Sequence, residues 1–431
     1  MTGLVDDLRF RGLIHQVTDE ALLDKLDAGG LSAYIGFDPT ASSLHVGNLL
    51  QLCTLRRLQL GGHRPIPLAG GGTGFIGDPS GKSDERNLLD LDELAANIEG
   101  IRPQLARFLD FTDSAGATRA LLADNAAWLG TVSLVTFLRD VGKYVTVNEM
   151  IKKDSVRSRI ERANEGISYT EFSYMLLQAY DFLRLHEDEG CDLQLGGSDQ
   201  WGNISLGVEV VGKVTGDRVY GLTTPLVTKA DGSKFGKTAE GAVWLDPSRT
   251  SPYRFYQFFV NTEDARVADY LRFFTFLSHE EIAALDAETA AHPERRTAQR
   301  ALAAAVCDLV HGEDETKRAE RASEALFSEA IDTLDEATLL EVFEDAPSTG
   351  LARGALGANG TAGLDIVDAL TLSGLCKSKG EARRLTEAGG VYVNNRRVEG
   401  SERALGEGDL LAGRYVVLRK GRREYHLLRV E

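Results

Sequence analysis

Short apolar runs alternate with helical patterns through the first half of the chain. The runs are rich in β-branched or aromatic residues, and they cover residues 31–37, 64–69, 117–123, 191–195 and 219–226. The stretches with helical periodicity lie between them, at residues 44–60, 170–185 and 201–211. Because this alternation is typical of βαβ units on a parallel sheet, we predict that residues 1–225 form an α/β domain.

The second half of the chain changes in character twice. Over residues 251–343 the strand patterns stop and Ala, Leu, Glu and Arg dominate, which predicts a helical domain. Residues 346–363 are mainly Gly, Ala, Ser, Thr and Pro, a composition typical of a flexible linker. A helical pattern followed by strand patterns then predicts a small α+β domain over residues 364–431.

Composition restricts the class of protein. The chain has 431 residues, 43% hydrophobic and 26% charged, which is typical of a multidomain globular protein and unlike disordered, collagen-like or membrane proteins. No apolar run approaches the roughly eighteen residues of a membrane helix. Asp6 and Asp7 stand where a signal sequence would be basic and then apolar, so we expect a cytoplasmic protein. The four cysteines lie far apart, and we predict neither a disulfide framework nor a metal site.

The net charge differs between parts of the chain. The formal total of −17 speaks against a protein that coats nucleic acid non-specifically. Residues 364–431, however, carry 13 Lys and Arg against 10 Asp and Glu, whereas residues 1–363 carry 35 against 55. The charge pattern therefore favours a protein that repels RNA broadly and accepts it on the basic tail.

Two glycine-rich segments contain lysines. Residues 72–77 match the G-x-G-x-x-G fingerprint of an NAD-dependent oxidoreductase, but Asp78 and Pro79 follow where the fingerprint needs an opening helix. Residues 77–83 and 232–238 resemble phosphate-binding P-loops, yet each has three residues where that loop needs four. The remaining interpretations are glycine backbone and lysines that follow a polyphosphate, or solvated surface turns.

The helical pattern at residues 170–185 carries a polar face beside its apolar stripe. Steps of three and four residues return to the same side of a helix, and on that side lie Glu171, Tyr174, Gln178 and Asp181. A phenol, an amide and a carboxylate one turn apart suit a small ligand, although a plain solvent face is the alternative. Residues 38–40, 78–80 and 194–203 follow predicted strands, so they lie at the carboxyl edge where open α/β sheets bind ligands.

These segments together resemble a known family, the class I aminoacyl-tRNA synthetases of the bacterial tyrosyl type. Residues 34–48 (YIGFDPTASSLHVGN) resemble the strand, loop and HIGH signature, and residues 234–238 (KFGKT) resemble the KMSKS loop. The tail from residue 364 resembles an S4-like RNA-binding domain. Three further segments resemble the amino-acid pocket, namely residues 71–87, 169–181 and 195–203.

The resemblance implies a domain division and a reaction. Residues 1–225 would be a Rossmann-like catalytic domain with a dimer-interface insertion, residues 226–345 the KMSKS-like loop and a helical anticodon-side domain, and residues 346–363 a linker. The enzyme would activate L-tyrosine with ATP and Mg²⁺, release pyrophosphate, and transfer the tyrosyl group to the 3′-terminal ribose of tRNA(Tyr). Since an ionised carboxylate attacks the α-phosphate, positioning and charge stabilisation are expected to carry the catalysis.

The resemblance also assigns roles to residues. The groups that act on the phosphates or the ribose are Thr40, His45, Asn48, Lys82, Arg86, Lys234, Lys237 and Thr238. The tyrosine contacts are Tyr34 and Asp181 at the phenol, and Asp78, Tyr174, Gln178 and Gln200 around the α-amino group. The further ATP contacts are Asp38, Gly47, Gly197 and Asp199. Gly47 is expected where a side chain would collide with the nucleotide, and Asn48, Phe235 and Gly236 depart from the family motifs.

The resemblance extends to the partners of the chain. The basic residues of the tail that would contact tRNA are Lys377, Lys379, Arg383, Arg384, Arg414, Arg419, Lys420, Arg422 and Arg423. Family members are homodimers, and residues 128–150 are the expected interface. A non-catalytic RNA-binding protein with the same fold is the alternative from another class, and His45, Lys234, Lys237 and Asp181 disfavour it.

Overall fold

The computed structural model describes residues 3–78, 90–153, 156–157, 160, 167–233, 235–238, 241–325, 329–344, 346–356, 363–421 and 424–431. The chain divides into two compact units. The first comprises Met1–Ser251 and Phe258–His311, and the second comprises Pro252–Gln257 and Gly312–Glu431. Among the described residues, no helix has the length and apolar character needed to cross a membrane.

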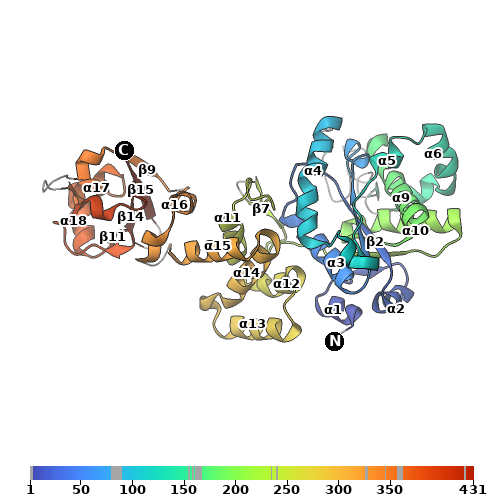
Figure 1. Ribbon diagram of the computed structural model, residues 1–431, viewed down its shortest axis with the longest axis horizontal. Helices are drawn as coiled ribbons and strands as arrows, with labels where there is room; N and C mark the ends of the chain where they lie inside the picture. Colours follow the sequence, from blue (N-terminus) through green and yellow to red (C-terminus); the bar gives the residue numbers. More distant parts are fainter. Residues whose placement is uncertain are drawn as a thin grey trace. The chain divides into compact units, whose positions relative to one another are not determined.

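A six-stranded sheet forms the centre of the first unit (Figure 1). Its strands, in spatial order, are β1 (Gln16–Val17), β6 (Tyr220–Thr224), β5 (Cys191–Gly197), β2 (Ser32–Phe37), β3 (Arg64–Ala69) and β4 (Ala123–Asp124). All neighbours pair in parallel except β1 and β6, which are antiparallel. The sheet confirms the predicted α/β fold, although the strand expected at residues 117–123 is reduced to the two residues of β4.

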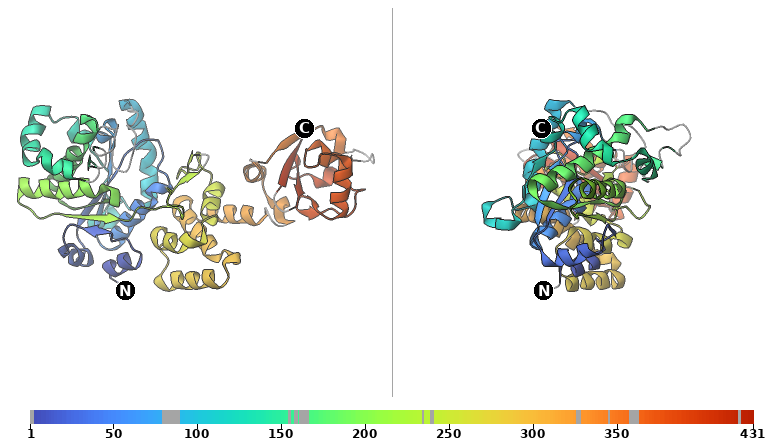
Figure 2. Two further views of the ribbon diagram at one scale, coloured as in Figure 1. Left: turned by 180° about the vertical axis from the view of Figure 1, so that it is seen from behind. Right: turned by 90° about the vertical axis from the view of Figure 1, so that its right-hand side faces the viewer.

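Helices cover both faces of this sheet. The helices α3 (Leu49–Leu60) and α4 (Leu91–Phe108) lie on one side, and α9 (Tyr169–Glu189) and α10 (Trp201–Thr215) lie on the other (Figures 1 and 2). The helix α9 begins at a capping box of Ser168 and Glu171 and ends at Gly190, whose φ of 62° is left-handed. Further α-helices before α10, among the described residues, are α1 (Leu4–Phe10), α2 (Ala21–Ala28), α5 (Ala126–Leu129), α6 (Leu134–Asp140) and α7 (Val147–Lys152).

The helical segment after the sheet does not form one domain of its own. The helices α12 (Asp264–Phe274), α13 (His279–Ala291) and α14 (Thr297–His311) belong to the first unit, and α15 (Glu313–Ala325) and α16 (Glu336–Val342) to the second. The helix α11 (Pro252–Val260) contributes to both units. The predicted domain at residues 226–345 is therefore divided, because Leu339 and Phe343 pack in one cluster with Val417 and Leu427 of the C-terminal sheet.

The second unit contains a five-stranded sheet. Its strands, in spatial order, are β12 (Arg396–Arg397), β11 (Val391–Val393), β14 (Tyr415–Lys420), β15 (Glu424–Val430) and β9 (Ser348–Leu351). The helices α17 (Ile366–Leu372) and α18 (Lys379–Glu387) and the short strands β10 (Leu364–Asp365) and β13 (Ala404–Leu405) complete it. This unit confirms the predicted α+β tail.

The prediction of a flexible linker at residues 346–363 is wrong for its first half. The strand β9 pairs in parallel with β15, and a 3-10 turn at Arg353–Leu356 follows. Leu351 and Leu356 are buried in the core of the second unit. The composition is rich in small residues, but two well-spaced leucines suffice to anchor the segment.

Candidate active site

The order in which strands are added to the first sheet reverses between β2 and β5, which lie side by side and parallel at its middle. The strands β3 and β4 add on one side of β2, and β5 and β6 add on the other side. Ligands of open α/β sheets bind at such a point, outside the carboxyl ends of the strands. The loops after β2 and after β5 hold Asp38 and Asp199, so the predicted site residues meet at this edge.

Tyr34 and Asp181 form a buried polar pair at one end of the site. Tyr34 on β2 is 1% exposed, and its ring packs on Phe182 with centroids 5.4 Å apart. Asp181 on α9 is 2% exposed, and its two carboxylate oxygens accept hydrogen bonds from Asn125 Nδ2 at 2.9 Å and Trp128 Nε1 at 2.7 Å. We call this cluster of Tyr34, Asp181, Asn125 and Trp128 the phenol end.

Asn125 and Trp128 were missed by the sequence analysis. Asn125 follows β4, so it stands at the same carboxyl edge as the loops that were identified, and Trp128 lies on α5 directly after it. Asn125 is fully buried, and its Oδ1 also accepts a hydrogen bond from the backbone N–H of Gly72 at 2.7 Å. The strand pattern that ends at Ala123 was the signal that could have located both residues.

Burial dominates the electrostatics of the phenol end. Desolvation raises the pKa of Asp181 to about 7, and the hydrogen bonds from Asn125 and Trp128 only partly oppose it. Desolvation, together with the nearby Asp181 carboxylate, also raises the pKa of Tyr34 well above its ordinary value. Near neutral pH, Tyr34 is therefore a hydroxyl donor, and Asp181 is poised between its neutral and ionised forms.

A chain of amides lies next to the phenol end. Gln178 Nε2 and Asn203 Nδ2 both donate to Gln200 Oε1 at 3.2 Å, and Asn203 Nδ2 also donates to Gln178 Oε1 at 2.9 Å. Gln200 Nε2 donates in turn to Asp78 Oδ2 at 2.6 Å. The structure thus brings together three of the residues predicted around an α-amino group, and it adds Asn203.

Tyr174 extends this group toward the nucleotide side. Its hydroxyl donates to Asp38 Oδ1 at 3.4 Å, and its side chain is 6% exposed. Glu171, on the same predicted face, caps the start of α9 instead. Because Tyr174 and Asp181 are buried, the polar face of α9 lines a site and is not a solvent face.

Two glycines at the carboxyl ends of β3 and β5, Gly70 and Gly197, have little room for a side chain. A Cβ at Gly70 would lie 2.8 Å from Asp38 Oδ1, and one at Gly197 would lie 2.6 Å from Asp199 Oδ1. The G-x-G-x-x-G segment forms a 3-10 turn at Thr73–Phe75, not the opening turn of a long helix. Its glycines therefore bring the backbone close to the site without building a dinucleotide fingerprint.

The segment around His45 forms the other end of the site, which we call the phosphate end. His45 Nδ1 accepts from the backbone N–H of Gly47 at 3.1 Å, and Asn48 Oδ1 accepts from the backbone N–H of His45 at 3.1 Å. Asn48 thus closes a capping box, which gives this departure from the family motif a local role. A Cβ at Gly47 would lie 2.7 Å from His45 Cε1, so the crowding within the protein is with His45. Thr40 is exposed at the mouth of the same edge.

The KFGKT segment docks on the phosphate end. The strands β7 (Lys237–Thr238) and β8 (Gly241–Ala242) form a hairpin, and the backbone N–H groups of Val46 and Leu245 donate to Val243 and Leu44 across the junction. Gly236 has φ +84°, and a Cβ there would lie 2.7 Å from Val46 Cγ2. Lys82, Arg86 and Lys234, and the side chains of Lys237 and Thr238, lie outside the described residues.

In the second unit, the candidate RNA contacts separate into two groups. Lys377, Lys379, Arg383 and Arg384 are exposed on and before α18. Arg419, in contrast, lies over the Tyr392 ring at 3.9 Å, and Lys420 Nζ donates to the Leu375 carbonyl at 2.9 Å. Arg414 is exposed, with Nη1 3.6 Å from Glu336 Oε1, and Arg422 and Arg423 lie outside the described residues. Arg419 and Lys420 are only partly exposed and have internal partners, whereas the α18 group is exposed even though Lys379 pairs with Asp368, so α18 is the better candidate surface.

Comparisons with known proteins identify the family of the chain. The family described as "tRNA synthetases class I (W and Y)" matches residues 27–328, and the "Tyrosine--tRNA ligase SYY-like C-terminal domain" matches residues 339–428. The tyrosine–tRNA ligase of Roseiflexus castenholzii is 55% identical over 430 residues, which is the full length of both chains. That of Geobacillus stearothermophilus is 50% identical over 99% of both chains.

A solved structure gives the same result. The C-terminally truncated mitochondrial tyrosyl-tRNA synthetase of Aspergillus nidulans is 35% identical, with a TM-score of 0.67, over 76% of this chain and 95% of that one. The two family descriptions match consecutive parts of the chain, and the relatives match over nearly its full length. The chain therefore belongs to the bacterial-type tyrosyl-tRNA synthetases, within the class I aminoacyl-tRNA synthetases.

Proposed function

We propose that this chain is a cytoplasmic tyrosine–tRNA ligase that forms tyrosyl-adenylate from tyrosine and ATP and then transfers the tyrosyl group to tRNA(Tyr). The observation that carries the proposal is the buried phenol end, where Tyr34 offers a hydroxyl donor and Asp181 a carboxylate acceptor. A substrate phenol can accept from the first and donate to the second. An NAD site finds no support in the turn at Thr73–Phe75.

The phenol end accounts for the choice of tyrosine over phenylalanine. Phenylalanine cannot supply the hydroxyl that accepts from Tyr34 and donates to Asp181, and hydrogen bonds lost between buried polar groups are costly. Tyrosyl-tRNA synthetases are the standard example of this effect. The carboxamide oxygens of Gln178 and Gln200, with Asp78, are the acceptors for the α-amino group.

The phosphate end accounts for the chemistry. The tyrosine carboxylate attacks the α-phosphate and pyrophosphate leaves, so the protein must stabilise negative charge that moves toward the leaving group. His45 and Thr40 stand at this edge, and the docked hairpin brings the backbone of Lys237 and Thr238 beside it. In this assignment, the lysines of KFGKT hold the leaving pyrophosphate.

Magnesium would enter this site bound to the nucleotide. Among the described residues, no three His, Cys, Asp or Glu side chains are grouped so that they could hold a metal ion. Mg²⁺ commonly retains waters and is held by substrate phosphates. When bound, it would neutralise charge on those phosphates, while His45 and the KFGKT segment orient them.

The direct test of the adenylation step is tyrosine-dependent exchange of labelled pyrophosphate into ATP by the full-length protein with magnesium. We expect exchange with tyrosine and none with phenylalanine at the same concentration. Absence of exchange in folded protein that still binds tRNA would instead support the non-catalytic RNA-binding alternative. NADH binding, followed by fluorescence, would support the oxidoreductase.

The exposed basic face of α18 is our candidate for tRNA contact. Arg383→Glu combined with Arg384→Glu should leave pyrophosphate exchange unchanged and lower the charging of tRNA about tenfold or more at physiological salt. Arg295→Glu, an exposed arginine of the first unit, serves as the control. Normal charging by the double variant would remove α18 from the function.

An exposed apolar surface supports a homodimer. Leu134 and Val135 on α6 are 71% and 75% exposed, and Val147 on α7 is 58% exposed. Apolar exposure of this kind, gathered on adjacent elements, is typical of an interface. The surface lies within the predicted segment at residues 128–150. Val135→Asp should convert a dimer to a monomer in sedimentation equilibrium, and an unchanged mass would contradict the assignment.

A further inference from the structure

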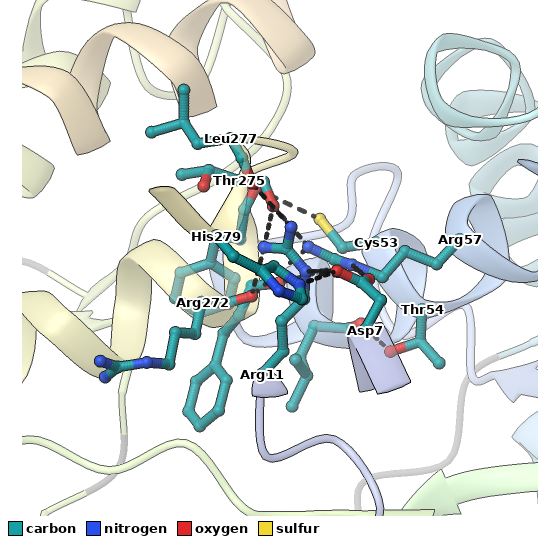
Figure 3. A network of polar contacts seen from close by, with 12 residues as sticks. Asp7, Arg11, Cys53, Thr54, Arg57, Arg272, Thr275, Leu277 and His279 are labelled. Atoms are coloured by element: carbon teal, nitrogen blue, oxygen red, sulfur yellow. Dashed lines mark hydrogen bonds and ion pairs between the residues drawn. The ribbon is translucent and has the colours of Figure 1, made fainter. Parts of the chain in front are cut away.

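A buried polar network connects the end of α12 with α1 and α3 (Figure 3). It is centred on Arg11, which directly follows α1, and on Arg57 of α3. Both arginines are buried, at 4% and 3% exposed. All of these elements belong to the first unit. The hydrogen bonds that both arginines donate run to Asp7 and to carbonyls of residues 272–277. None of these residues belongs to the phenol end or the phosphate end.

The two arginines bind the carbonyls at the C-terminal end of α12. The last carbonyls of an α-helix have no partner within the helix. Arg57 Nη1 donates to the Phe273 carbonyl at 3.2 Å, and Arg11 donates to the carbonyls of Thr275 at 3.0 Å and Leu277 at 2.7 Å. Positive charge is also favourable at this end of the helix dipole. The end of α12 is thereby fixed in position by both neighbours.

Asp7 of α1 orients these arginines. Its carboxylate accepts from Arg11 Nε at 2.8 Å and lies 3.8 Å from Arg57 Nε. It also contacts His279 Nε2 at 2.9 Å. Burial lowers the pKa of Arg57 to about 10, so its guanidinium stays charged at neutral pH. A planar guanidinium with several fixed donors sets an orientation that a flexible cation cannot set.

The helix α12 is the platform of the lysine loop. Phe235, the second residue of KFGKT, is 8% exposed and stacks on Phe274 of α12 with centroids 5.2 Å apart. Its ring also meets Tyr270 edge-on at 4.9 Å. The Tyr270 hydroxyl donates to the carbonyl of Thr228, at the stem of the loop, at 2.9 Å. Both the stem and the motif therefore rest on α12.

The helix α3 carries the opposite side of the phosphate end. It begins at Leu49, directly after the capping box of His45 and Asn48. The spacing between the lysine loop and His45 thus depends on how α12 sits on α3, in addition to the direct backbone hydrogen bonds of Val46 and Leu245. Arg57 and Arg11 fix that relation near Phe274, the residue on which Phe235 stacks.

We propose that Asp7, Arg11 and Arg57 are positioning residues for adenylate formation, which hold the lysine loop in register with the His45 segment by fixing α12 on α3. Buried charges cost more to desolvate than apolar packing of the same volume. Apolar side chains would therefore hold two helices together, but without the fixed directions of the hydrogen bonds that Arg11 and Arg57 donate to these carbonyls. The inference rests on the proposed function, since it requires the lysine loop to act on the phosphates.

The test is Arg57→Lys in the full-length protein, with Arg56→Lys as the matched control. Arg56 is the preceding residue of α3 and donates to the Phe108 carbonyl at 2.8 Å, not to α12. We expect Arg57→Lys to lower kcat for pyrophosphate exchange about tenfold and to leave the Kd for tyrosine within about twofold. Arg56→Lys should change neither value. An unchanged kcat, or an equal loss in tyrosine binding, would overturn the proposal.

A double-mutant cycle with Phe235→Leu separates positioning from general stability. If the network acts by positioning Phe235 on α12, the losses in kcat caused by Arg57→Lys and Phe235→Leu will not add. The double variant will then be no slower than the slower single variant. Additive losses would overturn the inference. Asp7→Asn, which leaves the arginine–carbonyl bonds possible, replaces Arg57→Lys in both experiments if that variant does not fold. A wild-type protein without tyrosine-dependent exchange would instead refute the proposed function itself.

Discussion

The phenol end and the phosphate end of the site are built in different ways. At the phenol end, Tyr34 and Asp181 are almost wholly buried, and the carboxylate is held by two side-chain donors from elsewhere in the fold. At the phosphate end, His45 is partly exposed, and the neighbouring contacts are backbone hydrogen bonds and glycines. One end is a buried cluster of hydrogen-bonded side chains, and the other is a junction between loops.

The difference matches what each end must recognise. A phenol keeps its position and charge through the reaction, so fixed and desolvated partners can select it without cost to catalysis. The charge on ATP moves from the α-phosphate toward the leaving pyrophosphate, so its partners must be placed for the transition state. We therefore expect substitutions at the phenol end to change selection and those at the phosphate end to change rate.

The largest expected effect is at the phosphate end. Lys237→Ala should lower kcat for pyrophosphate exchange by about 10²–10³-fold, because a cation that meets the developing charge is lost. The Kd for tyrosine should stay within about twofold. Lys25→Ala, an exposed lysine of α2, is the control in the same stopped-flow and equilibrium measurements. An equal loss in binding and rate would show that Lys237 has another role.

The next effect is at the phenol end. Trp128→Phe removes the 2.7 Å hydrogen bond to Asp181 while it keeps an aromatic ring in place. A hydrogen bond to a charged group contributes about 1.5–3 kcal/mol, so the KM for tyrosine should rise at least about tenfold with little change in kcat. The KM for ATP serves as the internal control. If kcat falls and the KM for tyrosine does not change, the two ends are not separable.

The pH dependence sharpens the account of Asp181. Its pKa is raised to about 7, so the carboxylate that accepts the substrate hydroxyl is lost as the pH falls through that value. One pH unit below the pKa leaves about a tenth of the Asp181 groups ionised, and one pH unit above it leaves about nine tenths ionised. The Kd for tyrosine should therefore be about tenfold higher at pH 6 than at pH 8. Trp128→Phe removes a donor that lowers this pKa, so it should move the midpoint above 7. A binding curve that is flat between pH 6 and 8 would refute the assignment.

The smallest expected effect tests how the lysine loop docks. Gly236 and Gly232 have similar φ values, +84° and +80°, but a Cβ would meet Val46 only at Gly236. Gly236→Ala should therefore lower kcat for exchange about fivefold, whereas Gly232→Ala, with equal backbone strain, should have a smaller effect. Thermal unfolding of both variants checks that stability changes equally. Equal kcat values would mean that the docked arrangement is not needed for the reaction.

Much of the fold and of the phenol end could be predicted from the sequence. The strand at residues 64–69 matches β3, and Tyr174 and Asp181 of the predicted polar face of α9 are buried, as a ligand-lining face requires. The partners Asn125 and Trp128 were missed because the apolar run that ends at Ala123 indicates the sheet edge, but the two-residue strand and four-residue helix beside them carry no periodicity that shows which side chains reach the site. In a long helix or strand, the periodicity shows which side chains share a face. In a short connection there is no such periodicity, so its role is known only once its position at the sheet edge is known.

In the second unit, a segment with no strand pattern in its sequence nevertheless forms a strand. Residues 346–356 have a linker composition, yet β9 pairs with β15 at the edge of the sheet. An edge strand needs only a few backbone hydrogen bonds and one buried side chain, here Leu351, with Leu356 of the following 3-10 turn buried beside it, so its sequence carries a weak signal. The positions of Arg419 and Lys420 also depend on cross-strand neighbours that the sequence does not reveal.

The separation of selection from catalysis is tested most directly by one ratio. It is the ratio of kcat/KM for tyrosine to kcat/KM for phenylalanine in pyrophosphate exchange, measured in Lys237→Ala and compared with the wild-type protein. Lys237 is assigned to the leaving group and not to the amino-acid side chain. We therefore predict that kcat/KM falls strongly for both tyrosine and phenylalanine and that their ratio is unchanged. A ratio that falls tenfold or more in Lys237→Ala would contradict the account.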